Sequence, residues 1–288
     1  MREGDYETAW RVSAEALGAR DPATRDDPAL PYHLRWVWDG RPVDGRHVLV
    51  RCYHGLGDTI QFARYLPLLA ERAASVRLEA PARLEALLKQ VPGVDRFIPF
   101  DPARPQPPAE CDVEIMELAF ALRTPPARLR PPYLHAAPAP LPDGTLALCW
   151  AAGEWDPARC VPPELLAGLC AERPCLSLVP GPTQLPVLNP EGCPLDMGLT
   201  ASWGAGASLV ITVDTMIAHL AGAMNKPTWL LLKHDPDWRW APQTGRSEWY
   251  PSVRLYAQEE PGAWDGVIAR VTDDLRAAPL PRTLENAR

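Results

Sequence analysis

The stretch that most constrains the fold is L-V-I-T-V-D-T-M-I-A-H-L-A-G, at residues 209–222. Its first five residues are apolar or β-branched, which suits a strand buried on both faces of a parallel sheet. Apolar residues then recur at helical spacing, and Asp214 and Thr215 are residue types that favour the N-cap of a helix. The sequence therefore predicts a strand that is followed at once by a helix.

The start of this helix is a candidate anion site. Its first backbone N–H groups would lie beyond the carboxyl end of a parallel strand, where the partial positive charge of the helix end favours a phosphate or diphosphate. The alternative is an ordinary helix that Asp214 and Thr215 merely cap. His219 lies one turn inside the helix, where a structural histidine is the alternative to a ligand contact.

Length and charge narrow the class of protein. A chain of 288 residues with 47% hydrophobic content is long enough for two compact domains. The net charge is −7 and Lys and Arg do not cluster, so a nucleic-acid partner is not expected. The apolar runs are far shorter than the roughly 20 residues that span a bilayer, and the N-terminus is acidic and polar. We expect a cytoplasmic protein without a transmembrane segment.

The seven cysteines form an odd set without a C-x-x-C pair, so they indicate neither a disulfide framework nor a zinc site. Cys52 and Cys149 fall in predicted strands and are expected to be buried. No cluster of metal-ligand residues stands out, and we expect no bound metal.

A second candidate site follows the strand predicted at residues 47–52. A turn with Gly55 and Gly57 leads into a helix predicted to reach about Arg72, an order typical of phosphate and nucleotide sites. Ile60 stands where a dinucleotide fingerprint has its third glycine. Glu79 nevertheless ends the next predicted strand, about where a ribose-binding acid would lie, so a nicotinamide enzyme stays an alternative.

Strands and helices alternate through the rest of the chain, which predicts parallel α/β sheets. The proline-dense stretch 125–142 is the candidate linker. We therefore expect an N-terminal helical segment at 1–30, a first Rossmann-like domain at 31–140 and a second at 141–288, with a cleft between the two domains. The further strands and helices are predicted at 75–78, 82–90, 96–98, 112–118, 146–150, 163–172, 175–178, 228–232, 253–257 and from 264 onward.

Several motifs in this order resemble glycosyltransferase family nine, the relatives of the ADP-heptose:lipopolysaccharide heptosyltransferases. They are G-L-G-D-T-I-Q-F-A-R-Y at 55–65, V-D-T with H-L-A-G within 213–222, P-D-W-R-W at 236–240 and W-Y-P at 249–251. The resemblance covers roughly residues 47–271. It is strongest to the glycosyltransferase-like domains that follow tetratricopeptide repeats in bacterial proteins.

This resemblance implies a GT-B fold, with the nucleotide-sugar donor held mainly by the second Rossmann-like domain and the acceptor mainly by the first. It also implies an inverting transfer that needs no metal or other cofactor. The partners would be a nucleoside-diphosphate sugar and a glycan, a lipid-linked sugar, a protein or a small molecule as acceptor.

On the acceptor side, Asp58 matches the general base of the family, which would take the proton of the acceptor hydroxyl. The alternative is that Asp58 caps a helix starting at Thr59. Gly55 and Gly57 match the turn that lets substrate approach the backbone. His54, which precedes the turn, is a candidate acceptor contact or auxiliary base.

On the donor side, Asp214, Thr215, Met216 and His219 match the diphosphate motif, with the Thr215 and Met216 amides as phosphate contacts. Arg159 matches a cationic loop position whose guanidinium would neutralise the leaving diphosphate in place of a metal ion. A solvated loop arginine is the alternative.

The tryptophan-rich motif offers further sugar contacts. Trp238, Arg239 and Trp240 are candidates because indole faces stack on the apolar faces of sugars, and packing within the protein is the alternative.

Two features depart from the family pattern. Glu154 and Asp156 add negative charge where a diphosphate is expected, and Met216 is bulkier than the glycine or alanine of many relatives. A catalytically degenerate module that binds a sugar or nucleotide, or acts as a scaffold, is therefore the alternative function.

Overall fold

The computed structural model describes residues 5–277, so positions 1–4 of the predicted N-terminal segment and 278–288 of the second predicted domain lie outside the described residues. The chain divides into two compact units, Met1–Leu134 and His135–Arg288, and the division falls within the proline-dense stretch. The first unit begins with helix α1 (Tyr6–Gly18), where the Asp5 side chain accepts the Thr8 N–H and Trp10 is buried.

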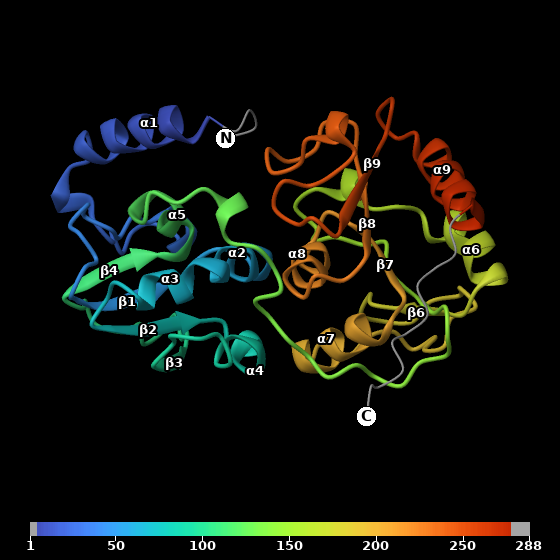
Figure 1. Cartoon of the computed structure of the whole chain (residues 1–288), viewed down its shortest axis with the longest axis horizontal. Coiled ribbons are helices and arrows are strands. Elements are labelled where there is room, and N and C mark those ends of the chain that lie inside the picture. Colours follow the sequence, from blue (N-terminus) through green and yellow to red (C-terminus); the bar gives the residue numbers. More distant parts are fainter. Residues whose placement is uncertain (1–4, 278–288) are drawn as a thin grey trace. The chain divides into compact units, whose positions relative to one another are not determined.

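Sheet A of the first unit has four parallel strands, in the order β3-β2-β1-β4 (Figure 1). The strands are β1 (His47–Arg51), β2 (Ser75–Ala80), β3 (Arg96–Pro99) and β4 (Cys111–Glu114). The helices of this unit after α1 are α2 (Leu56–Phe62), α3 (Leu66–Ala70), α4 (Glu85–Leu88) and α5 (Leu118–Ala121). Buried apolar strand residues such as Val48, Val50 and Leu78 form the centre of the unit.

Two elements of this unit differ from the sequence prediction. The helix predicted to reach Arg72 is divided into α2, a 3-10 turn (Ala63–Tyr65) and α3, because Pro67 has no N–H to bond the Ala63 carbonyl. The strand predicted at 112–118 ends at Glu114. The Glu114 side chain accepts the Met116 N–H at 2.7 Å, and this bond winds the chain into a 3-10 turn (Ile115–Glu117).

Sheet B of the second unit has five parallel strands, in the order β6-β5-β7-β8-β9 (Figure 1). Its strands are β5 (Leu146–Cys149), β6 (Cys175–Ser177), β7 (Leu209–Val213), β8 (Thr228–Leu232) and β9 (Val253–Ala257). Its helices are α6 (Ala167–Glu172), α7 (Met197–Gly206), α8 (Met216–Ala223) and α9 (Trp264–Ala277). The strand and helix predicted within 209–222 are therefore confirmed as β7 and α8.

The two faces of sheet B are covered by different helices, because successive side chains of a strand point to opposite faces. Leu146 and Leu148 of β5 pack in one core cluster with residues of α6 and α9. Ala147 and Cys149 pack in the other cluster with Ile217 and neighbouring residues of α8. Figure 1 shows α7 and α8 on one side of the sheet and α6 and α9 on the other.

Helix α7 was not predicted. Its sequence, M-G-L-T-A-S-W-G-A-G, is made mostly of small residues and has no clear apolar stripe. Asp196 begins the helix, because its side chain accepts the N–H groups of Gly198 and Leu199 at 2.8 and 3.1 Å. That cap was the signal available in the sequence.

The predicted burial of Cys52 and Cys149 is confirmed, and all seven cysteines are free thiols. Between residues 5 and 277, the structure contains no helix with the length and apolar character needed to cross a membrane.

Candidate functional site

The strand order of each sheet marks one place where a ligand site is expected. In sheet A the chain adds β2 and β3 on one side of β1 and β4 on the other, so the order reverses between β1 and β4. In sheet B it reverses in the same way between β5 and β7. Ligands of open parallel sheets bind beyond the carboxyl ends of the strands at such a switch point. The predicted site residues His54 and Asp58 follow β1, Arg159 follows β5, and Thr215 follows β7.

Asp58 lies in the first turn of α2, which starts at Leu56 rather than at the predicted Thr59. Its Oδ2 accepts the N–H of Gly55, the N-cap residue, at 3.1 Å. Asp58 therefore caps a helix, as the alternative interpretation predicts, and its side chain is also partly exposed. A Cβ on Gly55 would lie 3.2 Å from the same oxygen, which explains a glycine there without a special φ. Gly57 lies within α2, so the helix already begins between the two glycines.

His54 lies beside Glu114, a residue that the sequence analysis missed. Nε2 of His54 is 4.0 Å from Oε2 of Glu114, and the two side chains are 30% and 4% exposed. The pKa of Glu114 is raised to about 8. Burial is the main cause, the backbone N–H groups of Met116 and Tyr53 oppose the shift, and the negative charges of Glu117 and Asp58 support it. The available signal was a carboxylate placed among the apolar residues at the end of a strand.

Glu79 is not available as a ribose-binding acid. Its side chain is 1% exposed, and its Oε2 lies 3.1 Å from Nη1 of Arg51. Its other oxygen accepts the Gln106 N–H at 2.9 Å. Arg51 also pairs with Asp112 at 3.0 Å, and Asp112 pairs with Arg25 at 3.2 Å, so two arginines balance the two carboxylates inside the unit. This geometry argues against the nicotinamide alternative.

At the switch point of sheet B, Thr215 is the N-cap of α8, with extended backbone angles and no side-chain cap bond. Met216 is the first helical residue and packs at the edge of the core cluster that contains Ile217. Asp214 precedes the cap and is 9% exposed. Burial raises the pKa of Asp214, and the positive charge of Arg159 opposes that shift.

Arg159 is buried, so the alternative of a solvated loop arginine is wrong. The residue is 8% exposed, and its Nη1 donates to the Asp214 carbonyl at 2.7 Å. Its guanidinium lies 4.0 Å from the ring centroid of Trp155, which is 77% exposed. The structure thus brings the predicted arginine to the start of α8.

The acidic residues of the same loop differ in their surroundings. Asp156 lies 2.9 Å from Nζ of Lys233 and 3.8 Å from Nε of Arg159. The hydrogen bond from Lys233 is the main reason that the pKa of Asp156 is lowered. Glu154 is exposed. The Asp156 charge is therefore balanced within the protein.

His219 packs as a structural histidine. Its Nδ1 lies 3.0 Å from the Tyr250 hydroxyl, and its ring stacks on Trp240 with centroids 5.5 Å apart. Gly222 makes this packing possible, because a Cβ there would lie 2.4 Å from the Tyr250 ring. His219 is 6% exposed, so it could affect donor binding only indirectly, by fixing the position of α8.

The tryptophan motif divides into a buried and a partly exposed part. Trp240 is 0% exposed, which supports packing rather than sugar contact. Trp238 is partly exposed, and its ring meets that of Trp249 edge-on at 6.0 Å. Arg239 lies over Trp238 at 4.9 Å and bonds Asp237 at 3.0 Å. Trp238 and Arg239 stay candidates for sugar contact.

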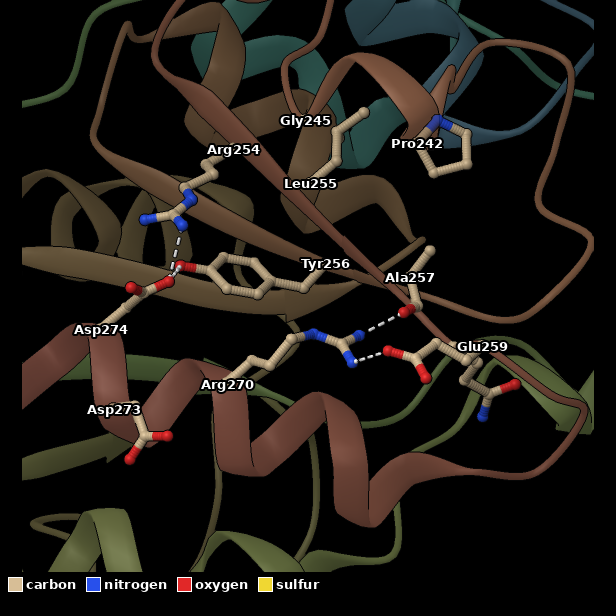
Figure 2. Close-up of a pocket in the computed structure, with 11 residues that line it drawn as sticks. Pro242, Gly245, Arg254, Leu255, Tyr256, Ala257, Glu259, Arg270, Asp273 and Asp274 are labelled. Atoms are coloured by element: carbon tan, nitrogen blue, oxygen red, sulfur yellow. Dashed lines mark hydrogen bonds and ion pairs between the residues drawn. The ribbon is translucent and has the colours of Figure 1, made fainter.

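A pocket of about 640 Å³ lies elsewhere in the second unit, beside β9 and α9 (Figure 2). None of the predicted site residues lines it. Its two arginines are paired with acids of the same pocket, Arg254 with Asp274 at 2.6 Å and Arg270 with Glu259 at 2.8 Å. Because these charges are already balanced, we do not assign the donor site to this pocket.

A curated protein matches part of the sequence. No family model matches the chain. Protein FlbA of Caulobacter vibrioides is 29% identical over 128 residues, which cover 42% of this chain and 21% of FlbA. The chain thus matches about a fifth of the length of this curated relative.

Solved structures match most of the chain. The glycosyltransferase TibC of enterotoxigenic E. coli superposes with a TM-score of 0.57 at 15% identity, over 79% of this chain and 67% of TibC. E. coli heptosyltransferase WaaC, solved with ADP, gives 0.57 at 12% identity, over 80% and 99%. A family 9 glycosyltransferase of Veillonella parvula gives 0.54 at 12%, over 82% and 90%.

This chain has the fold of the family 9 heptosyltransferases. The predicted GT-B fold class, with its two parallel-sheet α/β domains, is therefore confirmed, and the solved structures are members of the family that the motifs resemble. The association with tetratricopeptide repeats stays a prediction.

TibC is described as iron-containing. Within residues 5–277 of this chain, no three His, Cys, Asp or Glu side chains gather in a way that could hold a metal ion. The chain therefore offers no described ligand set to which an iron can be assigned, and metal independence stays a prediction.

Proposed function

We propose that the chain is a family 9 glycosyltransferase that moves a sugar, with inversion and without a metal ion, from a nucleoside-diphosphate sugar to a hydroxyl acceptor. The observation that carries the proposal is the bond from Arg159 to the Asp214 carbonyl, which places a buried cation at the start of α8. A leaving diphosphate needs such a combination of a cation and free helix N–H groups.

In the proposed reaction the acceptor hydroxyl gives its proton to the Asp58 carboxylate. At the same time the hydroxyl oxygen bonds to the anomeric carbon of the donor sugar. The bond between this carbon and the diphosphate breaks at the same time, which inverts the configuration. Arg159 and the first N–H groups of α8 then take up the negative charge of the leaving nucleoside diphosphate. Trp238 and Arg239 would contact the sugar.

The first donor to test is an ADP-linked heptose or hexose. WaaC was solved with ADP, and TibC was solved in complex with ADP-D-β-D-heptose. The acceptor is a glycan, a lipid-linked sugar, a protein or a small molecule, and we propose the cytoplasm as the site of action.

The test is a thermal-shift and calorimetric titration with ADP, UDP, GDP, CMP and NAD, first without metal and then with magnesium. At a nucleotide concentration of about 100 times Kd, a specific ligand stabilises the folded chain by about 2.7 kcal/mol. Selective, metal-independent stabilisation by one nucleoside diphosphate supports the proposal and identifies the donor class. Binding that requires magnesium would contradict metal independence.

A second candidate function is favoured by the capping bond of Asp58. Because this carboxylate accepts the Gly55 N–H, its presence can be explained without catalysis. The chain would then be a degenerate GT-B module that binds a sugar or nucleotide, or acts as a scaffold. Nucleotide binding without transfer to any offered acceptor, in the wild type and in Asp58→Asn alike, would favour this function.

A further inference from the structure

Glu114 occupies an unusual position at the switch point of sheet A. It is the last residue of β4 and lies opposite Arg51, the last residue of β1, in the parallel register. Its Oε2 accepts the Met116 N–H at 2.7 Å and lies 4.0 Å from Nε2 of His54. Its Oε1 is buried and has no hydrogen-bond partner among the described residues 5–277. A buried carboxyl oxygen without a hydrogen-bond partner costs free energy of folding, so its presence needs an explanation.

The charged and titratable groups around Glu114 come from the elements packed against it. They are His54, Asp58 of α2, Glu117 of the 3-10 turn, Arg51 and the buried thiol of Cys52.

The arginines of this region pair with other carboxylates. Arg51 is bound by Glu79 and Asp112. Arg20 lies 3.4 Å from Glu117. Among the described ion pairs, the basic side chain that meets the Glu114 carboxyl is His54, at 4.0 Å.

We propose that Glu114 is a positioning residue of the acceptor site, which acts through His54 by anchoring the imidazole at the carboxyl end of sheet A beside Asp58. This proposal rests on the proposed function for the role of the acceptor. The His54 side chain is 30% exposed and that of Glu114 is 4% exposed, so a ligand at this edge can contact the imidazole more readily than the carboxyl. Glu114 acts as a positioning group for this reason, and Asp58 keeps the role of base.

The ionisation of Glu114 falls near neutral pH. The pKa of its carboxyl is raised to about 8, chiefly by burial and also by the negative charges of Glu117 and Asp58, so the carboxyl keeps its proton below this pH. Because Nε2 of His54 lies 4.0 Å from Oε2 of Glu114, the imidazole should sense the negative charge that forms on Glu114 above this pH.

The experiment is an NMR titration of the imidazole signals in the full chain, with the His54 signal assigned by its absence in His54→Gln. We expect the wild-type His54 signal to move in two steps, one from protonation of the imidazole itself and one near pH 8 from the ionisation of Glu114. In Glu114→Gln the step near pH 8 disappears, because the glutamine amide cannot ionise. A single step, unchanged by Glu114→Gln, would overturn the proposal.

The matched control is Glu117→Gln. Glu117 is a neighbouring carboxylate of the same turn, but it bonds Arg20 and the Glu114 N–H. The control should keep both steps of the His54 titration, with the upper step at a lower pH, because the charge of Glu117 contributes to the raised pKa of Glu114. Loss of the upper step in the control as well would assign the effect to the fold of the turn and overturn the role of Glu114.

Transfer assays separate this proposal from the proposed function. Ionised Glu114 adds a negative charge where the acceptor oxygen also becomes negative, so wild-type kcat/KM should fall as pH rises through about 8. Glu114→Gln should remove this fall and leave the Kd of the nucleotide within about twofold. If no transfer occurs at all, the proposed function fails, while the two-step titration still decides whether Glu114 and His54 form a pair.

Discussion

The two switch-point edges have the same architecture and opposite charge. At sheet A, Glu114 lies close enough to Asp58 for its pKa to be raised by that charge, and His54 lies 4.0 Å from Glu114. At sheet B, Arg159 and the start of α8 come together, and Lys233 balances the acid of the same loop. The difference lies in loops and strand ends rather than in the sheets. An acidic edge suits removal of a proton from an acceptor, and a cationic edge suits a diphosphate.

The largest expected effect is the loss of the base at sheet A. Asp58→Asn keeps an oxygen that can accept the Gly55 N–H, so α2 should stay capped, but the side chain no longer takes a proton. We expect transfer to fall by about 100-fold to 10,000-fold while the Kd of the nucleotide stays unchanged. Single-turnover transfer and calorimetric binding measure the two quantities.

The matched control for this variant is Asp44→Asn, the same chemical change in an exposed turn before β1, where Asp44 pairs with Arg72 at 2.8 Å. Its transfer rate should stay near the wild-type value. If the transfer rate of Asp58→Asn is also within about threefold of the wild-type rate, Asp58 is a helix cap only. The charge difference between the two edges would then have no role in catalysis.

The sequence predicted the parts of both edges that depend on local pattern. The β7 strand and the start of α8 follow from five buried residue types and a cap, and the structure has them at the predicted residues. Periodicity could not predict α7, since small residues leave no apolar stripe. Burial of Arg159 and the partner of Glu114 depend on which strands become neighbours in space, which a local pattern does not contain.

The next effect concerns the cation at sheet B. Arg159→Met removes the guanidinium beside the start of α8, and we expect the Kd of the nucleoside diphosphate to rise by about 10-fold or more, because a charge-assisted hydrogen bond is worth about 1.5–3 kcal/mol. Arg159→Lys restores the charge without the planar fork and should lie between Met and wild type. Calorimetry with the nucleotide selected by the titration gives the three values.

Removal of Arg159 also leaves the Asp214 carbonyl without its donor, so the melting temperature of each variant must be measured alongside the Kd. The control is Arg173→Met, a partly buried arginine just before β6, at the opposite end of the same sheet. Equal affinity of Arg159→Met and Arg173→Met would place the anion site away from α8.

A moderate effect is expected on the pH dependence of stability. The pKa of Glu114 is about 8 in the folded chain and near the ordinary glutamate value of 4.5 in the unfolded chain. The folded state therefore binds the proton more tightly, and the stability that this supplies is complete below pH 4.5 and is lost as pH rises toward 8. At about 1.4 kcal/mol per pKa unit, the loss is on the order of 5 kcal/mol.

Glu114→Gln should abolish this loss. Wild type and variant should melt at similar temperatures near about pH 5, while at about pH 8.5 the variant should melt at least about 5 °C higher. The thermal denaturation of both proteins across this range measures the difference. Parallel curves would show that Glu114 ionises at its ordinary pKa and that the acidic edge carries one more negative charge at neutral pH.

The smallest expected effect tests whether the acids of the Arg159 loop weaken the cationic edge. Asp156 is already balanced by Lys233, so its charge should have little influence on a bound diphosphate. Glu154 is exposed, and at this exposure solvent and salt screen its charge. Glu154→Gln should therefore tighten nucleotide binding by no more than about threefold, and by less as salt increases. A tenfold gain would instead mean that Glu154 faces the diphosphate directly and that the cationic edge of this chain is partly cancelled, which is the property expected of a degenerate module.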